Sequence, residues 1–505
     1  MTRRSARHSM PPVVRSRCLI ATTTVVPGHQ AGNPYPESVS SSEAMSGADT
    51  AWLHMDRPNN LMVISGALWF DEPVDWEQLR EVVSSRLVDR FPRFRQRVVD
   101  SRLPLRGPHW EDDPDFDLEL HLHRAALPVP GDRAALQDFL TDLIAQPLDH
   151  SRPLWNWYLI DGYGSGSAIV ARMHHCIADG IALARVLLSL TDSSPEAGIE
   201  PGKPAETPHH GGITGTVGDV LRPARQAASL TRTLAGAAAH EAIEIARDPS
   251  ELVDLATAAS LDAKALVKTL LPGADTPSVL KGHLGVPERV AWSDPIPLAD
   301  VKAAGHALDA TVNDVLIAAV TGALHTYLAA RDSLVDELHA FVPFNLRPLD
   351  QPLPRHLGNR FGLVRLAIPV GTEDPCERLE QVRRGMTEIK HSPEGAVSYG
   401  MLGAIGATPA AIEQRLLELF SAAGSVVMTN VPGPREPVYL AGTPVRGVLV
   451  WAPTSGSVSM SVSIFSYNGE VTVGVMSDRG LVPDPGEIVA AFGREVEAML
   501  ATGAS

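Results

Sequence analysis

The order of hydrophobic and polar positions predicts alternating strands and helices in the first part of the chain. Leu61–Phe70 is almost continuously apolar and predicts a strand, whereas the spacing of apolar residues over Trp76–Leu87 predicts an amphipathic helix. Leu118–His123 alternates apolar and polar residues, which predicts a half-exposed strand, and Ala134–Ala145 has helical spacing. Together these segments indicate an α/β arrangement.

The next segments predict a β-hairpin followed by a helix. Trp155–Ile160 and Ala168–His175 are apolar and are separated by the glycine-rich turn Asp161–Ser167. After Gly180, the strongly apolar segment Ile181–Leu190 predicts a helix.

A second α/β region is predicted from about Arg289 onward, without a sequence repeat that relates it to the first. Its predicted elements are helices over Val312–Leu328 and Pro375–Lys390, strands over Leu338–Phe344 and Leu363–Val370, and a strand-rich and turn-rich segment over Val426–Ser477.

Between the two regions the sequence predicts a linker. Residues 191–215 are polar and contain Pro, Gly and His, and Thr216–Leu271 has an Ala-rich helical pattern interrupted by Pro223 and Pro249. Acidic residues offset the basic ones in this helical stretch. A linker or packing role is therefore favoured over a basic membrane-binding helix.

Residues 1–44 differ from the rest of the chain, because they contain five arginines against two glutamates and have no sustained periodicity. We consider a signal peptide around Cys18–Val26, a disordered basic tail, or translation that begins at Met45. Three threonines interrupt the apolar stretch and no clear small-residue cleavage site follows it. A tail or a mis-set start is therefore favoured.

Composition and charge exclude several classes of protein. The 505 residues suggest two or three domains, and the net charge of −16 argues against nucleic-acid binding, which needs clustered Lys and Arg. Three scattered cysteines are too few for a disulfide framework and fit a reducing, cytoplasmic compartment. No stretch reaches the ~18 uninterrupted apolar residues of a membrane-spanning helix. Contact with lipid would therefore be peripheral.

The densest group of reactive side chains lies at the end of the predicted hairpin. His174 and His175 are adjacent, so their side chains would point to opposite faces unless the strand ends between them. One should therefore be catalytic and the other structural. A neutral imidazole, with a pKa of ~6.5, can accept a proton near pH 7. Asp179 could fix the following loop through a charged partner, and Gly180 permits a tight turn or a close backbone approach.

The residues alone leave other interpretations of this segment open. Both histidines could be purely structural. His175 and Asp179 could contribute to a metal site together with distant histidines, although no further ligands follow at convincing spacing. Cys176 is a weaker candidate for a nucleophile, because strand alternation would place it on the face opposite His175.

The HHxxxDG pattern of residues 174–180 resembles the acyl-transfer motif of the CoA-dependent acyltransferase superfamily. Four further segments narrow the resemblance to the wax ester synthase/diacylglycerol acyltransferase family of bacteria and plants. They are Pro153-Leu154-Trp155, Asn313–Ala318 (NDVLIA), Gly358–Gly362 (GNRFG) and Thr429–Pro434 (TNVPGP). NDVLIA departs from the family's NDVVLA at two conservative positions. The resemblance runs from about Ser46 to Pro485, with the motifs in consistent order.

This resemblance implies an α/β fold made of two chloramphenicol-acetyltransferase-like domains joined by a helical linker. The active site would lie at the interface of the two domains and be reached by a tunnel. The expected division of the chain is a disordered basic tail or mis-set start (1–44), an N-terminal acyltransferase domain with HHxxxDG (45–190), a largely helical linker (191–285) and a C-terminal acyltransferase domain (286–505).

The implied reaction moves a long-chain fatty acyl group from acyl-CoA to diacylglycerol, to a long-chain alcohol, or to both. The resemblance assigns the general base to His175, a supporting role to His174, and structural roles to Gly180 and to Asp179, the latter usually through an arginine. Implied substrate-pocket or structural elements, for which core packing is the alternative, are Pro153, Leu154, Trp155, Asn313 and Asp314.

The expected partners are acyl-CoA and a lipid acceptor, with no nucleic acid, no metal and no cofactor, since acyl-CoA is a substrate. Peripheral contact with a membrane or a lipid droplet is compatible with a cytoplasmic enzyme, and the oligomeric state is not indicated. Two alternatives are an acyltransferase for another hydroxyl or an amine acceptor, and a catalytically silent lipid-binding protein. The intact HHxxxDG argues against the second, because a binding protein needs no base there.

Overall fold

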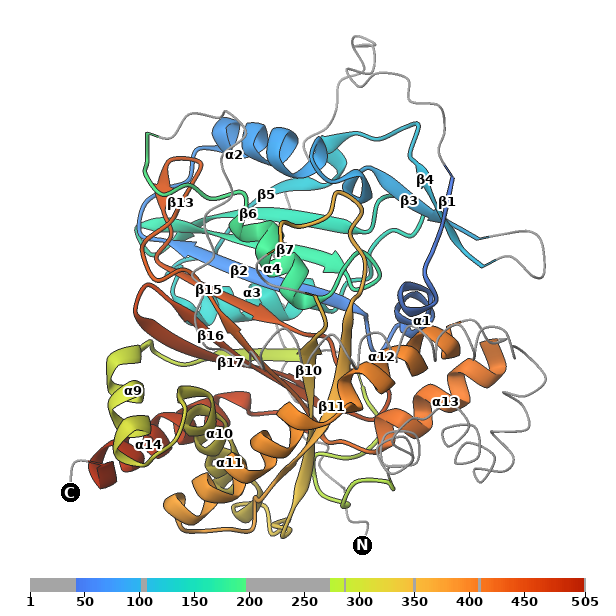
Figure 1. Ribbon diagram of the computed structural model, residues 1–505. Coiled ribbons are helices and arrows are strands. Elements are labelled where there is room, and N and C mark those ends of the chain that lie inside the picture. Colours follow the sequence, from blue (N-terminus) through green and yellow to red (C-terminus); the bar gives the residue numbers. More distant parts are fainter. Residues whose placement is uncertain are drawn as a thin grey trace, which may run out of the picture. The chain divides into compact units, whose positions relative to one another are not determined.

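The computed structural model describes most of the two predicted α/β regions. The described residues are 42–100, 107–196, 273–285, 288–347, 351–406 and 410–503. The predicted tail, up to residue 41, and most of the predicted linker, residues 197–272, lie outside the described residues. The described chain contains two large mixed sheets flanked by helices (Figure 1), which confirms the predicted α/β class.

The first sheet has the strand order β15-β2-β7-β6-β5. Its strands are β2 (Val63–Phe70), β5 (Leu122–Ala126), β6 (Trp155–Tyr163), β7 (Gly166–His174) and β15 (Gly447–Trp451). The predicted hairpin is confirmed as β6 and β7, which pair antiparallel. Every residue of the central strand β7 is buried. This explains why β7 is a nearly continuous apolar run, since neither of its faces meets water.

Helices and short strands complete the first α/β region. They are β1 (Glu43–Ala44), α1 (Gly47–Met55), α2 (Trp76–Val82), the π-helical η1 (Val83–Val88), the 3-10 turns η2 (Pro92–Phe94) and η3 (Leu118–Leu120), β3 (Gln96–Val99), β4 (His109–Asp112), α3 (Arg133–Ile144) and α4 (Gly180–Leu188). Asp132 and Asp179 cap α3 and α4, and each side chain accepts a backbone N–H of the first turn.

The second sheet has the order β11-β10-β12-β16-β17-β8, and the short strand β9 also pairs with β17. Its strands are β8 (Glu288–Trp292), β9 (Ile296–Pro297), β10 (Leu338–Asn345), β11 (Phe361–Ile368), β12 (Val426–Pro432), β16 (Met460–Tyr467) and β17 (Glu470–Asp478). Strands β10, β12 and β16 run parallel to one another, and the other pairs are antiparallel. β13 (Tyr439–Leu440) and β14 (Thr443–Pro444) form a separate small hairpin.

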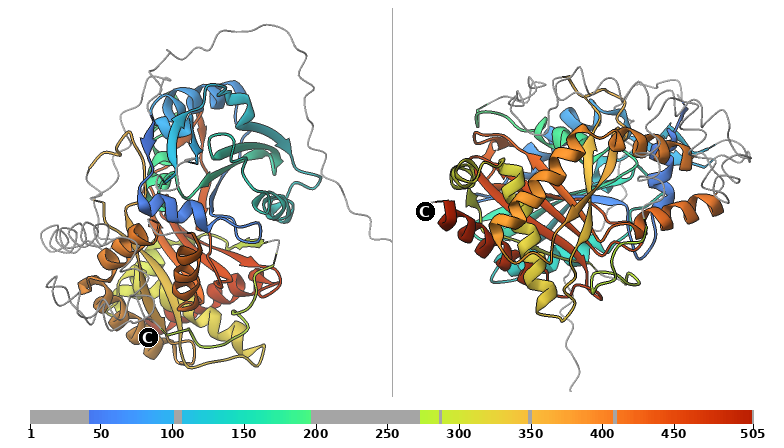
Figure 2. Two further views of the ribbon diagram at one scale, coloured as in Figure 1. Left: turned by 90° about the vertical axis from the view of Figure 1, so that its right-hand side faces the viewer. Right: turned by 60° about the horizontal axis from the view of Figure 1, so that its bottom comes forward.

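The helices of the second region are α9 (Leu298–Ala307), α10 (Val312–Ala329), α11 (Pro375–His391), α12 (Glu394–Ile405), α13 (Ala410–Ala422) and α14 (Pro485–Gly503). In Figures 1 and 2, α9, α10, α11 and α14 lie together on one side of the second sheet. By length and hydropathy α10 could cross a membrane, but 72% of it is buried, and it packs against α9, α11 and α14. It therefore has the surroundings of a core helix.

One strand connects the two regions in a way that the sequence did not indicate. β15 lies far along the chain, yet it pairs antiparallel with β2 at the edge of the first sheet and also contacts β16 and β17. Three tryptophan rings meet at this junction: Trp292 lies 6.1 Å from Trp69 and 5.9 Å from Trp451 between ring centroids. The first sheet is thus completed by a strand from the C-terminal region.

Two expectations need correction. The predicted strand Leu118–His123 begins as the 3-10 turn η3, because the Asp117 side chain accepts the N–H of Glu119 and turns the chain before β5 begins. Glu43 and Ala44, which we assigned to the tail, form β1 and pair with β4. The alternating pattern of Leu118–His123 therefore reflects a turn followed by a strand, and Glu43 and Ala44 belong to the first α/β region.

Candidate active site

Strand β7 ends between the two adjacent histidines. His174 is the last residue of β7, and the chain turns at once, since the N–H of Ile177 donates to the carbonyl of His174 at 3.0 Å. The N–H of His175 donates to the carbonyl of Met62 at 2.7 Å. The sequence predicted a strand that continues through His175, with the two side chains on opposite faces; the strand ends at His174 instead, and the two rings still have different surroundings.

The His175 ring lies in an aromatic pocket to which both regions contribute. It stacks on Trp52 of α1, with ring centroids 4.0 Å apart and an interplanar angle of 14°, and Phe361 of β11 lies 5.4 Å away. His175 is only 5% exposed. This burial lowers the pKa of His175 to about 3, because a charged imidazolium loses its hydration there.

Asn359, immediately before β11, holds His175 from the second region. Its Oδ1 lies 3.0 Å from Nδ1 of His175, and its Nδ2 donates to the His175 carbonyl at 2.7 Å. The same Nδ2 and the backbone N–H of Asn359 both donate to Oδ1 of Asp49 on α1, each at 2.8 Å. Asn359 thus ties together α1, the end of β7 and the loop before β11.

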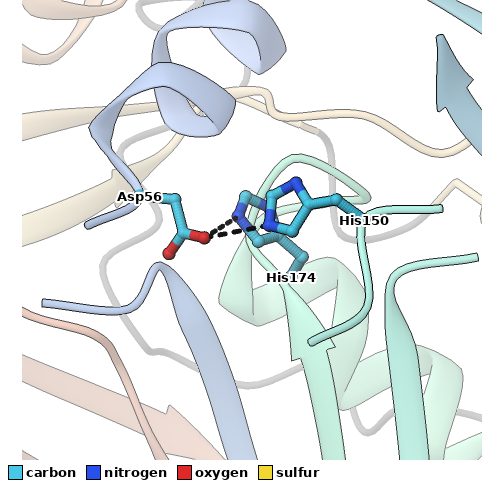
Figure 3. Close-up of side chains that lie close together, drawn as sticks. All are labelled: Asp56, His150 and His174. Carbon is cyan, nitrogen blue, oxygen red and sulfur yellow. Dashed lines mark hydrogen bonds and ion pairs between the residues drawn. The ribbon is translucent and has the colours of Figure 1, made fainter. Parts of the chain in front are cut away.

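His174 points into a different pocket, which it shares with Asp56 and His150 (Figure 3). Nε2 of His150 lies 3.1 Å from Oδ2 of Asp56, and Nε2 of His174 lies 3.8 Å from the same oxygen. Although burial opposes it, the two histidines hold the pKa of Asp56 well below its usual range. Burial lowers the pKa of the fully buried His174, and Asp56 partly opposes this shift.

One nitrogen or oxygen atom from each of these three side chains lies within 4.8 Å of the other two, which is close enough for a single metal ion to be considered. The N–H of Cys176 donates to Nδ1 of His174 at 3.1 Å, and Nδ1 must therefore carry a lone pair. The proton of the neutral ring is then on Nε2, the atom that faces Asp56. A protonated Nε2 has no lone pair to give to a metal ion, so the arrangement fits electrostatic attraction to the Asp56 carboxylate and not coordination.

Asp179 connects the turn after His175 to the second region. Its Oδ1 accepts the N–H of Ala182 at 2.8 Å, and its Oδ2 accepts the N–H of Arg360 at 3.1 Å. The guanidinium of Arg347 lies 3.6 Å from Oδ2 and also donates to the Gly358 carbonyl at 2.9 Å. Arg347 therefore matches the arginine that the resemblance implied without naming. Both carboxylate oxygens of Asp179 are engaged in this network.

The position of Gly180 does not itself require a glycine. Gly180 is the first residue of α4 and does not have a positive φ. A Cβ placed there would meet no heavy atom within 4 Å. Neither the tight turn nor the close backbone approach that we expected is seen, and the space beside this residue is open.

The predicted PLW segment lies next to the histidines in the first sheet. Leu154 and Trp155 are fully buried, Pro153 is buried too, and the carbonyl of Leu154 accepts the N–H of His174 at 2.9 Å. Nε1 of Trp155 donates to the carbonyl of Phe94 at 2.8 Å. These contacts describe packing that supports the end of β7, and a role in the substrate pocket stays a prediction.

Asn313 and Asp314 stand at the start of α10. Asp314 forms a capping box with Thr311, in which each side chain accepts the other's backbone N–H. Oδ1 of Asn313 accepts a hydrogen bond from Nδ2 of Asn430 at 2.7 Å, so the NDVLIA and TNVPGP motifs meet. Their described hydrogen bonds do not reach His175, and their role in the substrate pocket stays a prediction.

Four side chains that surround His175 and Asp179 were not predicted individually from the sequence: Trp52, Asp49, Asn359 and Arg347. Asn359 lies within the GNRFG segment, so the motif carried a signal for it, although not for its contact. Trp52 and Asp49 share a helix that has no distinctive motif, and Arg347 follows β10 at a position that its local sequence does not mark.

Comparisons with known proteins identify the family of this chain. The model of the wax ester synthase/diacylglycerol acyltransferase catalytic domain matches residues 45–316, and the model of the C-terminal domain of this family matches residues 357–500. A putative diacylglycerol O-acyltransferase of Mycobacterium tuberculosis is 28% identical over 482 residues, which cover 91% of this chain and 90% of the relative. A probable diacylglycerol O-acyltransferase (tgs1) of the same species is 30% identical over 419 residues, covering 81% of this chain and 85% of the relative.

Solved structures share the fold. The wax ester synthase/diacylglycerol acyltransferase from Marinobacter aquaeolei VT8 superimposes with a TM-score of 0.63 at 22% identity, covering 92% of this chain and 100% of that one. The first condensation domain of the calcium-dependent antibiotic synthetase gives 0.56 at 16% identity, covering 93% and 97%. Since the catalytic-domain model alone matches more than half of the residues, this chain belongs to the wax ester synthase/diacylglycerol acyltransferase family and is an acyltransferase.

Proposed function

We propose that this enzyme transfers a long-chain fatty acyl group from acyl-CoA to the hydroxyl of diacylglycerol, of a long-chain alcohol, or of both, with His175 as general base. The observation that carries the proposal is the neutral, buried His175, which lies at the junction of the two regions and has aromatic and amide neighbours. The names of the mycobacterial relatives support diacylglycerol as an acceptor, and the family supports both acceptors.

The proposed chemistry is a direct transfer without a covalent acyl-enzyme. A hydroxyl is a weak nucleophile at neutral pH, so Nε2 of His175 takes its proton as the oxygen attacks the thioester carbonyl. The tetrahedral intermediate then expels the CoA thiolate, which the imidazolium protonates. A positioned base typically accelerates such a step by ~10²–10⁴-fold. The face of Trp52 is well placed to stabilise the imidazolium that forms, since aromatic faces attract cations.

The experiment that tests the proposal is an acceptor panel. The purified chain is incubated with radiolabelled palmitoyl-CoA and, separately, with diacylglycerol, hexadecanol or hexadecylamine, and the products are separated by thin-layer chromatography. We expect labelled triacylglycerol or wax ester that depends on the acceptor, and no product from either in the folded His175→Ala variant. Product only from the amine would support the alternative acceptor class. Binding of acyl-CoA without turnover on any acceptor would support a silent lipid-binding protein.

Peripheral contact with a membrane or lipid droplet, in the cytoplasm, is part of the proposal because the substrates are lipids. The chemistry of the substrates supports it; α10, the one described helix long and apolar enough to cross a membrane, is mostly buried in the core. Co-sedimentation with diacylglycerol-containing vesicles tests it: an enzyme that stays in the supernatant while turning over vesicle-borne diacylglycerol would contradict stable attachment.

A further inference from the structure

We propose that Asn359 is a positioning residue that places the proton of neutral His175 on Nδ1 and so leaves the lone pair of Nε2 free to act as the base. The inference rests on the proposed function, since it specifies how the base of that reaction is prepared. It concerns a side chain from the second region acting on a histidine of the first, across 184 positions of the sequence.

The first step is the orientation of the Asn359 amide. Its Nδ2 lies 2.7 Å from the carbonyl oxygen of His175, which can only accept a hydrogen bond. Nδ2 also lies 2.8 Å from Oδ1 of Asp49, an oxygen that already accepts the backbone N–H of Asn359. Rotating the amide by 180° would place two oxygens against each other at both contacts. The donor side of the amide therefore faces away from the imidazole.

The second step follows from this orientation. The atom that faces Nδ1 of His175 at 3.0 Å is the amide oxygen Oδ1, which has no proton to give. Nδ1 must therefore be the donor, and in a neutral imidazole the other nitrogen, Nε2, then carries the lone pair. Neutral is also the ionisation state that burial favours for this ring. The result is the tautomer that a base acting through Nε2 requires.

The third step concerns the choice of an amide over a carboxylate. A carboxylate at this position would hold the same proton but would also favour the imidazolium, as Asp56 does in the neighbouring His174 pocket. The neutral amide orients the ring without adding charge. The titratable groups around His175 are Asp49 on α1 and the two residues that flank His175 in the chain, His174 and Cys176. Asp49 contacts the Asn359 amide and not the imidazole ring of His175. The Asp49 carboxylate also accepts a hydrogen bond from the Ser46 hydroxyl at 2.6 Å.

Nitrogen-15 NMR of the full-length chain with labelled histidines tests the inference directly, without substrate. The resonances of His175 are assigned by comparison with His175→Gln. We expect wild-type His175 to carry its proton on Nδ1, and Asn359→Ala to weaken this preference, part of which remains because the His175 backbone also forms a hydrogen bond with the ring. Asn156→Ala is the matched control, because Asn156 lies away from the site and its side chain contacts another histidine, His123, at 3.3 Å. It should leave the His175 signals unchanged.

The ratio of the changes in kcat and KM, and the pH profile of kcat, are measurements that a merely structural role of Asn359 would leave unchanged. Loss of a group that orients a catalytic histidine is expected to lower kcat, here by roughly 10–10²-fold for Asn359→Ala, with little change in KM. Asn359→Asp retains an acceptor for Nδ1 and adds negative charge, so the acidic limb of its kcat profile should move to higher pH. Asn359→Asp also tests the inference if Asn359→Ala does not fold.

Three results would overturn the inference: a wild-type His175 protonated on Nε2, an unchanged tautomer in Asn359→Ala, or an unchanged pH profile in Asn359→Asp. Failure of the proposed function is distinguishable from these. A wild-type protein that carries the Nδ1 proton yet acylates no hydroxyl acceptor would contradict the reaction and leave the assigned tautomer standing.

Discussion

The two adjacent histidines occupy pockets of opposite character. The His174 ring lies inside the first region, beside the carboxylate of Asp56. The His175 ring lies where the two regions meet, between the faces of aromatic rings and an asparagine amide. A single peptide bond therefore separates a histidine with an acidic partner from one with a neutral partner.

This difference shows how two identical side chains receive different tasks. A carboxylate beside an imidazole favours its charged form, which cannot accept a further proton. His174 has such a neighbour, although burial still lowers its pKa. Its Nδ1 accepts the N–H of Cys176, so this neutral ring has no free lone pair for a further proton and is suited to hold the end of β7 in place. Among the described residues no carboxylate contacts the His175 ring, which burial keeps neutral, as a proton acceptor requires.

Removing Arg347 should disturb the His175 pocket most and leave the His174 pocket intact. Arg347→Ala leaves the buried Asp179 without its charged partner and frees the Gly358 carbonyl, next to Asn359. We expect the free energy of unfolding, measured by urea titration, to fall by about 3 kcal/mol. The control is Arg446→Ala, which removes an exposed pair with Glu470 and should cost less than about 1 kcal/mol. Equal losses would contradict a special role for the buried contact.

The pH dependence of stability should separate the two histidines. The pKa of His175 falls from its ordinary ~6.5 to about 3 in the folded chain, so below pH 6.5 the unfolded chain binds a proton that the folded chain does not. The free energy of unfolding is therefore unaffected by this group above pH 6.5. As the pH falls from 6.5 toward 3, that free energy decreases by up to about 1.4 kcal/mol per pH unit.

The measurement is urea unfolding between pH 4.5 and 7.5. His175→Gln should flatten the dependence on pH more than His174→Gln, because Asp56 partly opposes the lowering of the pKa at His174. A larger flattening from His174→Gln would show that the two pockets are assigned the wrong way round.

Trp52 belongs to the His175 pocket alone, so replacing it should slow catalysis without affecting the His174 pocket. Trp52→Leu removes the ring that stacks on His175, and loss of a desolvated cation–π contact predicts a kcat lower by about fivefold to thirtyfold. Trp52→Phe should recover part of the loss. If leucine and phenylalanine were equally active, the aromatic face would have no part in stabilising the imidazolium.

The smallest effect is expected where α1, the helix that carries Trp52, meets α13. Nδ1 of His54 lies 2.7 Å from the carboxylate of Glu413, and this hydrogen bond raises the pKa of His54. The pair therefore stabilises the fold below pH 6.5, and its contribution is lost as the pH rises through the raised pKa. His54 is half-exposed, so we expect less than about 1 kcal/mol. His54→Ala should lower the melting temperature more at pH 5.5 than at pH 8.5.

The sequence was sufficient for features that depend on neighbouring residues. Two apolar segments separated by a glycine-rich turn predicted the hairpin of β6 and β7. The adjacency of His174 and His175 predicted different surroundings for their side chains, although β7 ends one residue earlier than predicted. The motif resemblance predicted the α/β fold, which the solved relative shares. These features are local or carried by several motifs in a fixed order, and both kinds of signal can be read along the chain.

Contacts between distant segments could not be predicted in this way. Nothing around Gly447–Trp451 indicates that this strand pairs with β2 and not within its own region. Likewise, Asn359 meets His175 only after β11 docks beside α1, and Arg347 meets Asp179 only through the same docking. Periodicity reports which residues are buried. It does not report which buried surface they face.

The most direct test of the central claim is the single-turnover rate of acyl transfer from palmitoyl-CoA to diacylglycerol in two neighbouring variants. Our account predicts that His175→Ala, shown to be folded by circular dichroism, reduces this rate by ~10²–10⁴-fold. It predicts that His174→Ala acts mainly by lowering the melting temperature. Transfer at the wild-type rate by folded His175→Ala would contradict the assignment of His175 as the base.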